Sequence, residues 1–352
     1  MTAQLRQLMR LDLERIDLRK GVLGLGAILA FGVFVAIFGN IGMVAALATL
    51  FAIVADQPGP LRARGLGALI MTGIGSIIAL VGTWAGPEHV VVAALLTFVV
   101  VLLATLVAGL GQALAVRGML LSVWAVVAIS FADGPETAMQ MAIAYLGGGL
   151  IAAAIIYLRT RALPEPSLAE EAEDATRTFE QVLSSSFGAF ALLRALAAGL
   201  AMWAGATLFP EHAIWAALTV ILVMKPRVGE TVASGVLRAG GTVIGVLAAE
   251  ALILASDGET AFVLIGFLLA AIGMAALQKV NYAVFVACLT ALLVLSEQLA
   301  TGTGEATAAD RLWATLLGAA IVFVAIAFGR AMHGKPVMST EPDPAGNGAD
   351  PT

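Results

Sequence analysis

The sequence predicts an all-α polytopic membrane protein. Hydrophobic residues make up 60% of the 352 residues and charged residues only 12%, whereas roughly 25% charged residues are typical of soluble domains. The mean hydropathy is +0.98. Apolar stretches close to the length of about 20 residues that spans a bilayer recur along most of the chain. The two halves of the chain also repeat one another.

About twelve stretches are apolar and long enough, or nearly so, to cross a membrane as helices. They lie at residues 21–38, 41–55, 65–84, 90–110, 115–132, 137–158, 191–208, 213–224, 235–255, 260–277, 281–297 and 309–331. Several are short. The first two stretches, and the seventh with the eighth, have an alternative interpretation as hairpins with tilted or partly unwound arms.

The distribution of charge supports this number of spans. Basic residues collect on the cytoplasmic side of membrane proteins. With twelve spans and both termini in the cytoplasm, all of the 19 Lys and Arg residues except Arg311 lie on that side. The loops on the other side carry acidic residues instead. We therefore expect a multi-pass protein with both termini in the cytoplasm.

The internal repeat relates short motifs about half a chain apart. The Ala-Ala-Leu run at 45–47 recurs at 216–218, and the run at 64–67, one arginine followed by a glycine-rich stretch, recurs at 238–241. Six spans in each half is an even number, so the halves have the same orientation. The sequence predicts two parallel six-helix repeats, an arrangement typical of transporters that bind substrate between repeats.

A second pattern lies within the second half, where the spacing Arg-x3-Thr-x2-Gly occurs twice. The residues are Arg238, Thr242 and Gly245, and Arg311, Thr315 and Gly318. The two units are an odd number of spans apart, so they run in opposite directions, as in inverted 3+3 repeats. Chance similarity among helices rich in Ala, Gly and Leu is the alternative.

The same pattern predicts an anion path. At about 100° per residue, each Arg-Thr-Gly set falls on one helix face. We expect each arginine near a helix N-terminus, where free backbone amides and a guanidinium together bind anions. One basic, glycine-lined gate would then lie at each end of the path. The alternatives are that Arg238 anchors the helix to lipid headgroups, that Asp310 or Glu305 pairs with Arg311, and that the glycines serve only close helix packing.

Three further segments flank the predicted membrane repeats at 21–158 and 191–331. Residues 1–20 form a predicted amphipathic segment at the cytoplasmic surface. Residues 159–190 are acidic and predict a cytoplasmic connector. Residues 332–352, rich in Pro, Gly and Asp, predict a disordered cytoplasmic tail.

The second half resembles the fusaric-acid-resistance-like (FUSC) transporters. The motifs that carry this resemblance are Trp215-Ala-Ala-Leu-Thr219, Pro226-x-x-Gly229-x-Thr231, and Arg238-x-x-Gly241-Thr242-x-x-Gly245. Members are related to aromatic acid exporters and, more distantly, to plant malate-permeable anion channels. The resemblance implies efflux of small organic, often aromatic, acids across a bacterial cytoplasmic (inner) membrane, driven by the proton gradient.

Other residues of the second half are candidates for transport. Glu250 lies well inside an apolar span, where a carboxylate is a candidate proton relay, and Glu297, at the outer end of its span, is a weaker candidate. Lys225 with Pro226, and Lys279 with Tyr282, form two inner-face clusters where an anion could enter. Trp215 or Tyr282 could stack on an aromatic ring, and Thr219 is also expected to line the path. Because topology alone predicts basic inner loops and interfacial aromatics, each of these residues also has a purely structural interpretation.

The sequence offers little for catalysis. His89, His212 and His333 lie in loops or the tail without metal-ligand spacing, and no phosphate-binding P-loop is present. We therefore expect no enzyme activity, catalytic residue, metal, cofactor or nucleic-acid partner. The expected partners are a small organic anion and membrane lipid, with a homo-oligomer or a membrane-fusion protein left open. The alternatives to an exporter are a passive organic-anion channel and a non-transporting scaffold subunit.

Overall fold

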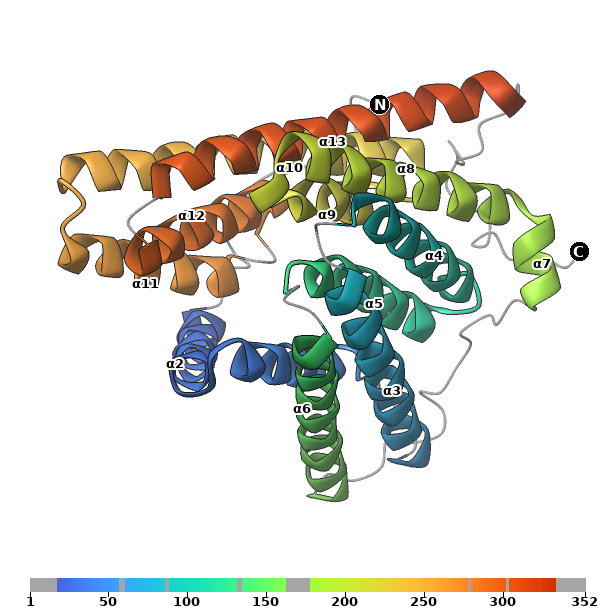
Figure 1. Ribbon diagram of the computed structural model, residues 1–352, viewed down its shortest axis with the longest axis horizontal. Helices are drawn as coiled ribbons and strands as arrows, with labels where there is room; N and C mark the ends of the chain where they lie inside the picture. Colours follow the sequence, from blue (N-terminus) through green and yellow to red (C-terminus); the bar gives the residue numbers. More distant parts are fainter. Residues whose placement is uncertain are drawn as a thin grey trace, which may run out of the picture.

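The computed structural model describes residues 18–56, 61–85, 89–131, 135–162, 178–277, 280–301 and 304–333. Within these ranges the chain forms helices joined by short turns, with no β-strand (Figure 1). The predicted all-α class is therefore confirmed. Residues 163–177 of the predicted connector lie outside the described residues. The predicted N-terminal segment and C-terminal tail also lie outside them, except for residues 18–20 and 332–333.

The first half contains five long helices. They are α2 (Leu18–Val54), α3 (Leu61–Ala85), α4 (Val90–Ala108), α5 (Gln112–Ile129) and α6 (Pro135–Ala162). Helix α2 is broken at Gly39, whose φ of 58° and ψ of −142° suit glycine because other residues would clash there. The boundary between the first two predicted spans falls at this kink, and Figure 1 shows the two arms of α2 running in different directions.

In the described residues, the second half begins with a short helix and continues with six longer helices and one 3-10 turn. They are α7 (Phe179–Ser184), α8 (Ser186–Leu208), the 3-10 turn η3 (Pro210–His212), α9 (Ile214–Val223), α10 (Val228–Ala255), α11 (Thr260–Ala276), α12 (Tyr282–Thr301) and α13 (Gly304–His333). A capping box between Thr178 and Gln181 starts α7, which occupies the end of the predicted connector.

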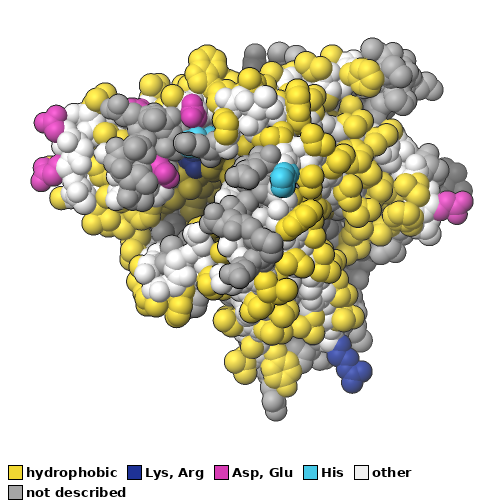
Figure 2. All heavy atoms as spheres, viewed as in Figure 1, with side chains coloured by type: hydrophobic (Ala, Val, Ile, Leu, Met, Phe, Trp, Pro, Cys, Tyr) yellow, Lys and Arg dark blue, Asp and Glu magenta, His cyan; other side chains and the backbone are white. Residues whose placement is uncertain are grey.

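Eight of the described helices are long and apolar enough to cross a membrane, and three shorter helices are also apolar. Large hydrophobic side chains such as Ile77 (63% exposed) and Leu247 (62% exposed) point outward along them. Figure 2 shows a surface dominated by hydrophobic side chains, with few charged ones. Lipid is the solvent that makes such a surface stable, so the chain is a multi-pass membrane protein.

The α8–α9 hairpin lies at the centre of the main hydrophobic core. Helix α8 packs on α4, and α9 packs on α5 and α13. Ala216, Ala217 and Val220 of α9 are completely buried in this core. A helix of only 10 residues is too short to span a bilayer alone, but α9 is surrounded by protein rather than lipid.

In both halves, a glycine permits close contact between two helices. In the first half, a Cβ at Gly148 of α6 would overlap the carbonyl oxygen of Ala45 in α2, and the Thr49 hydroxyl donates to the Gly148 carbonyl at 2.8 Å. In the second half, a Cβ at Gly318 of α13 would lie 2.5 Å from the carbonyl oxygen of Ala216 in α9. In each half, a glycine of the last helix thus lets that helix approach the Ala-Ala-Leu motif.

Candidate functional site

A pocket in the second half lies between four helices. Its lining comes from α9, α10, α12 and α13, and consists of Trp215, Arg238, Thr242, Val286, Leu289, Thr290, Leu293, Arg311 and Thr315. Two arginines, three threonines and a tryptophan thus meet an aliphatic wall supplied by α12. The cavity is about 20 Å³, room for about one water-sized guest. We refer to it as the arginine pocket.

Glycine spacing brings α10 and α12 close enough to form this pocket. A Cβ at Gly241 would lie 2.5 Å from the Ala283 carbonyl oxygen, and one at Gly245 would lie 2.8 Å from Thr290 Cβ. Small residues permit such close backbone approach. Gly245 and Gly318 therefore lie at helix contacts, while their motif partners Thr242 and Thr315 line the cavity.

Arg238 points from α10 into the protein and is only 6% exposed. Its Nε donates a hydrogen bond to the Thr219 hydroxyl at 3.3 Å, and that hydroxyl donates to the Trp215 carbonyl at 2.8 Å. Arg238 therefore does not reach the lipid-facing surface, as a headgroup anchor would. Thr219, a predicted path residue, holds its guanidinium.

Arg311 enters the pocket from α13 and is 8% exposed. The central carbon of its guanidinium lies 3.7 Å from the centroid of the Trp215 ring. Its Nε is buried without a hydrogen-bond partner. The sequence alternative that Asp310 pairs with Arg311 is wrong, because consecutive residues on a helix point about 100° apart and Asp310 contacts His212 at 3.4 Å.

The expected position of each arginine at a helix N-terminus is also wrong. Helix α10 begins at Val228 and α13 begins at Gly304, well before Arg238 and Arg311. Both helices extend past their apolar stretches, so the backbone amides near the arginines are already bonded within the helix. The two arginines line one pocket rather than separate gates at opposite ends.

The charges around the arginine pocket favour an anion. Arg238 and Arg311 are close enough for their charges to repel, and Glu297 of α12 is close enough to attract Arg311. None of the residues that line the pocket is a carboxylate. Two guanidinium groups therefore face a cavity in which negative charge would be stabilised.

The remaining predicted residues lie outside this pocket. Lys225 and Pro226 form the turn between α9 and α10, where the Thr231 hydroxyl accepts the Lys225 N–H at 2.8 Å. Burial, followed by the nearby charge of Arg194, lowers the pKa of Lys225. Tyr282 begins α12.

The other candidates are also accounted for. The ring of Tyr282 stacks on Phe285 with centroids 6.4 Å apart. Glu250 lies on α10 but does not line the pocket. Lys279 lies outside the described residues.

Sequence reasoning missed two groups near the site and undervalued a third. Thr290 lines the pocket, and its Leu-Thr context in the sequence resembles that of Thr219. Glu297 lies at the predicted end of its span, where it looked less important than Glu250. The charge rule predicts only that Arg194 lies on the cytoplasmic side, whereas the structure shows that it caps α9: its Nη2 donates to the Ile221 carbonyl at 2.6 Å.

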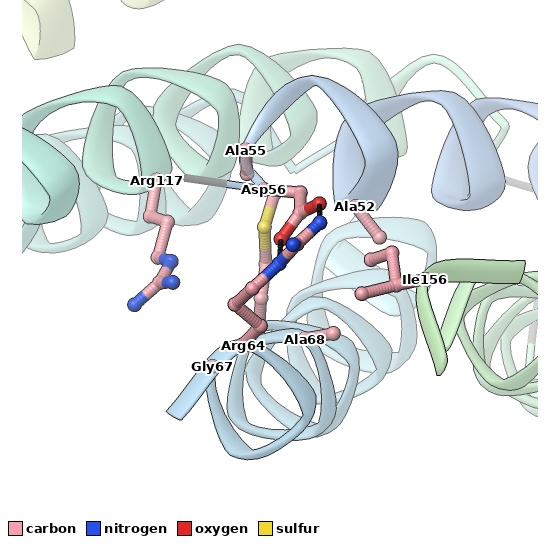
Figure 3. Close-up of a pocket in the computed structure, with 9 residues that line it drawn as sticks. Ala52, Ala55, Asp56, Arg64, Gly67, Ala68, Arg117 and Ile156 are labelled. Carbon is pink, nitrogen blue, oxygen red and sulfur yellow. Dashed lines mark hydrogen bonds and ion pairs between the residues drawn. The ribbon is translucent and has the colours of Figure 1, made fainter. Parts of the chain in front are cut away.

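The first half contains a different pocket, shown in Figure 3. Arg64 of α3, which aligns with Arg238, forms a two-point ion pair with Asp56, with Nε and Oδ1 2.9 Å apart. Arg117 of α5 lies to one side of this pair. The pocket has no room for a water-sized guest. The arginine that corresponds to Arg238 is therefore already neutralised in this half.

In a comparison with known proteins, the match falls in the half of the chain that holds the arginine pocket. A sequence model described as fusaric acid resistance protein-like matches residues 177–325. This range includes every residue that lines the arginine pocket. No curated protein and no solved structure matches the chain. Residues 177–325 are thus similar to the fusaric acid resistance protein-like family.

Proposed function

We propose that this protein exports small organic carboxylates, including aromatic ones, across the bacterial cytoplasmic membrane, and that the arginine pocket binds the carboxylate. The observation that carries the proposal is the convergence of Arg238 and Arg311 on one cavity without a lining carboxylate. The similarity of residues 177–325 to the fusaric acid resistance protein-like family supports a role in efflux.

The pocket offers both parts of such a substrate a suitable environment. A buried charge is costly unless it is paired, so an incoming carboxylate would stabilise the two guanidinium groups while they bind it. The orphan Nε of Arg311 is one donor available for that bond. Thr242, Thr290 and Thr315 add hydroxyl groups, and the aliphatic side chains of α12 contact the apolar part of the substrate.

The position of Arg311 changes the expected role of Trp215. Because the guanidinium covers one face of the indole ring, that face is not available to an aromatic substrate. Trp215 acts through Arg311, holding its charge in place without neutralising it. Recognition therefore depends on the carboxylate more than on the substrate's ring.

We further propose that the chain comprises twelve membrane spans in two parallel six-helix repeats. The contacts between the halves support this arrangement, because they are reciprocal. Helix α8 packs on α4, and α2 packs on α11. The first span of the second repeat thus contacts the fourth span of the first, and the kinked helix that holds the first two spans of the first repeat contacts the fourth span of the second. The two Arg-x3-Thr units that line one pocket support an inverted relation within the second half.

The driving force and the route of the substrate belong to the same proposal. With both termini in the cytoplasm, Lys225, Pro226, Lys279 and Tyr282 lie toward the side from which an exported anion enters. Glu250 is the proposed proton-coupling carboxylate. The arginine pocket is closed to anything larger than about one water, so substrate passage requires the helices around it to move apart.

Transport in proteoliposomes tests the proposal, with benzoate as the probe. Uphill benzoate movement that a protonophore abolishes supports an exporter, and downhill flux alone supports the channel alternative. Arg238→Gln and Arg311→Gln should each lower transport by on the order of tenfold or more, since each removes a charge-assisted bond. Arg227→Gln is the matched control, because Arg227 is 43% exposed and pairs with Glu230. Wild-type benzoate flux unaffected by both pocket variants would remove the arginine pocket from the mechanism.

A further inference from the structure

Glu297 lies one helical turn beyond the arginine pocket. Thr290 and Leu293 of α12 line the pocket, and Glu297 follows them at i+7 and i+4. Residues with these spacings share one face of a helix. Glu297 therefore belongs to the α12 face that meets α10 and α13, and its side chain is partly buried there.

Arg311 is the group on which Glu297 acts. The carboxylate attracts the Arg311 guanidinium, whereas Arg238 repels it. The guanidinium is held by the Trp215 ring and retains an orphan Nε. Glu297 thus attracts the same cation that an organic carboxylate would bind in the pocket.

The other charged groups around α12 have different positions. Helix α10 contains Arg238, Glu250 and, in its first turn, Glu230, and helix α11 contains no charged residue. On α13, Asp310 contacts His212 rather than Arg311. In the turn before α11, Asp257 and Glu259 lie beyond the end of α10. Among the described carboxylates, Glu297 is the one whose charge attracts Arg311.

We propose that Glu297 is an internal competitor for Arg311, so that protonation of Glu297 strengthens the binding of an organic anion in the arginine pocket. This inference rests on the proposed function of that pocket. An ionised Glu297 attracts Arg311 and repels the incoming carboxylate. A protonated Glu297 does neither, so the full charge of Arg311 acts on the substrate.

The competition between Glu297 and the substrate fixes how proton binding and anion binding affect one another. Linkage requires that if a proton strengthens anion binding, the anion equally strengthens proton binding. Proton and anion then occupy the protein together rather than displacing one another. A proton on Glu297 consequently favours co-transport, and exchange of a proton for an anion needs a second group, for which Glu250 is the candidate.

Binding of benzenesulfonate to the purified full-length protein tests the inference by titration calorimetry. The sulfonate stays ionised from about pH 4 to about pH 8, so any pH dependence arises in the protein. Wild-type affinity should rise as the pH falls, by on the order of fivefold or more. Glu297→Gln should bind as tightly at high pH as the wild type does at low pH. Glu230→Gln is the control, because the Glu230 side chain is 43% exposed and pairs with Arg227, and it should retain the wild-type pH dependence.

Two results would overturn the inference. One is a Glu297→Gln protein that keeps the full pH dependence, and the other is a wild type that binds equally at every pH. If Glu297→Gln does not fold, Glu297→Asp replaces it, since the shorter carboxylate should compete less and reduce the pH dependence. An unchanged dependence there would also contradict the proposal. Failure of the wild type to bind benzenesulfonate or benzoate at any pH would instead count against the proposed function itself.

Discussion

The Arg311 guanidinium lies over the indole ring of Trp215, with 3.7 Å between its central carbon and the ring centroid. The contact joins α13 to α9, the short helix at the centre of the main core. A desolvated cation–π contact stabilises by about 2 kcal/mol. Unlike an ion pair, it holds the arginine while leaving its positive charge available to a bound anion.

Replacement of the Trp215 ring should therefore weaken anion binding through Arg311. Trp215→Leu should lower benzoate transport and the melting temperature, while Trp215→Phe, which keeps an aromatic face, should lose less of both. Trp313→Leu is the control, because Trp313 neighbours Arg311 in the sequence but is 59% exposed. Equal losses in the Trp215→Leu and Trp215→Phe variants would show that the size of the side chain, rather than its aromatic face, matters at this position.

Arg311→Lys tests whether geometry or charge alone serves the substrate. Lysine keeps the positive charge but lacks the planar fork that binds a carboxylate at two points. We expect Arg311→Lys to retain more benzoate transport than Arg311→Gln but to remain roughly tenfold below the wild type. Transport by Arg311→Lys at the wild-type rate would mean that a point charge is sufficient.

Gly318→Ala should loosen the contact between α9 and α13. The new Cβ would lie 2.5 Å from the Ala216 carbonyl oxygen, so the helices must move apart at a cost of about 1–3 kcal/mol. Gly240→Ala is the matched control, because nothing lies within 4 Å of its Cβ position. Removing a helical glycine there should raise stability by roughly 0.5–1 kcal/mol. Thermal unfolding in detergent compares the two variants, and a stable Gly318→Ala would contradict the packing.

Because Asp56 and Arg64 form an ion pair, substitutions of the two residues should have non-additive effects on stability. Asp56→Asn leaves the Arg64 guanidinium without its carboxylate and should destabilise the first half by on the order of 3 kcal/mol. The double variant Asp56→Asn with Arg64→Gln should recover much of that loss, since no unpaired charge remains. A double-variant cycle of melting temperatures measures the coupling, and strict additivity would argue against the ion pair.

How much the sequence could predict depended on how local each feature is. The apolar stretches predicted where the helices lie, because about 20 apolar residues suffice to define a span. The Arg-x3-Thr spacing predicted that Arg238 and Thr242 share a face, as helix geometry requires. The convergence of Arg238 and Arg311 on one cavity arises from packing among four helices, which no spacing along the chain records.

The charge rule says nothing about the contacts of a basic residue. It predicted only that Arg194 lies on the cytoplasmic side, from its sign alone. The structure places it among α4, α8 and α9, where Nη1 donates to the Thr105 hydroxyl at 3.2 Å and Nη2 to the Ile221 carbonyl at 2.6 Å. The carbonyl groups at the end of α9 need donors because the helix stops inside the protein. That need is visible only once α9 is known to be so short.

Lys225 gives a prediction with a defined pH dependence. Burial and the positive charge of Arg194 lower its pKa in the folded protein, so folding disfavours its charged form. This destabilisation is present at neutral pH and fades as the pH rises through the folded pKa toward the ordinary value for lysine. Lys225→Met should therefore raise the melting temperature at about pH 7 and raise it less at about pH 10. Arg227→Met, which removes a more exposed cation of the same turn, is the control and should show no such trend. A gain in melting temperature from Lys225→Met that grows with pH would contradict the lowered pKa of Lys225.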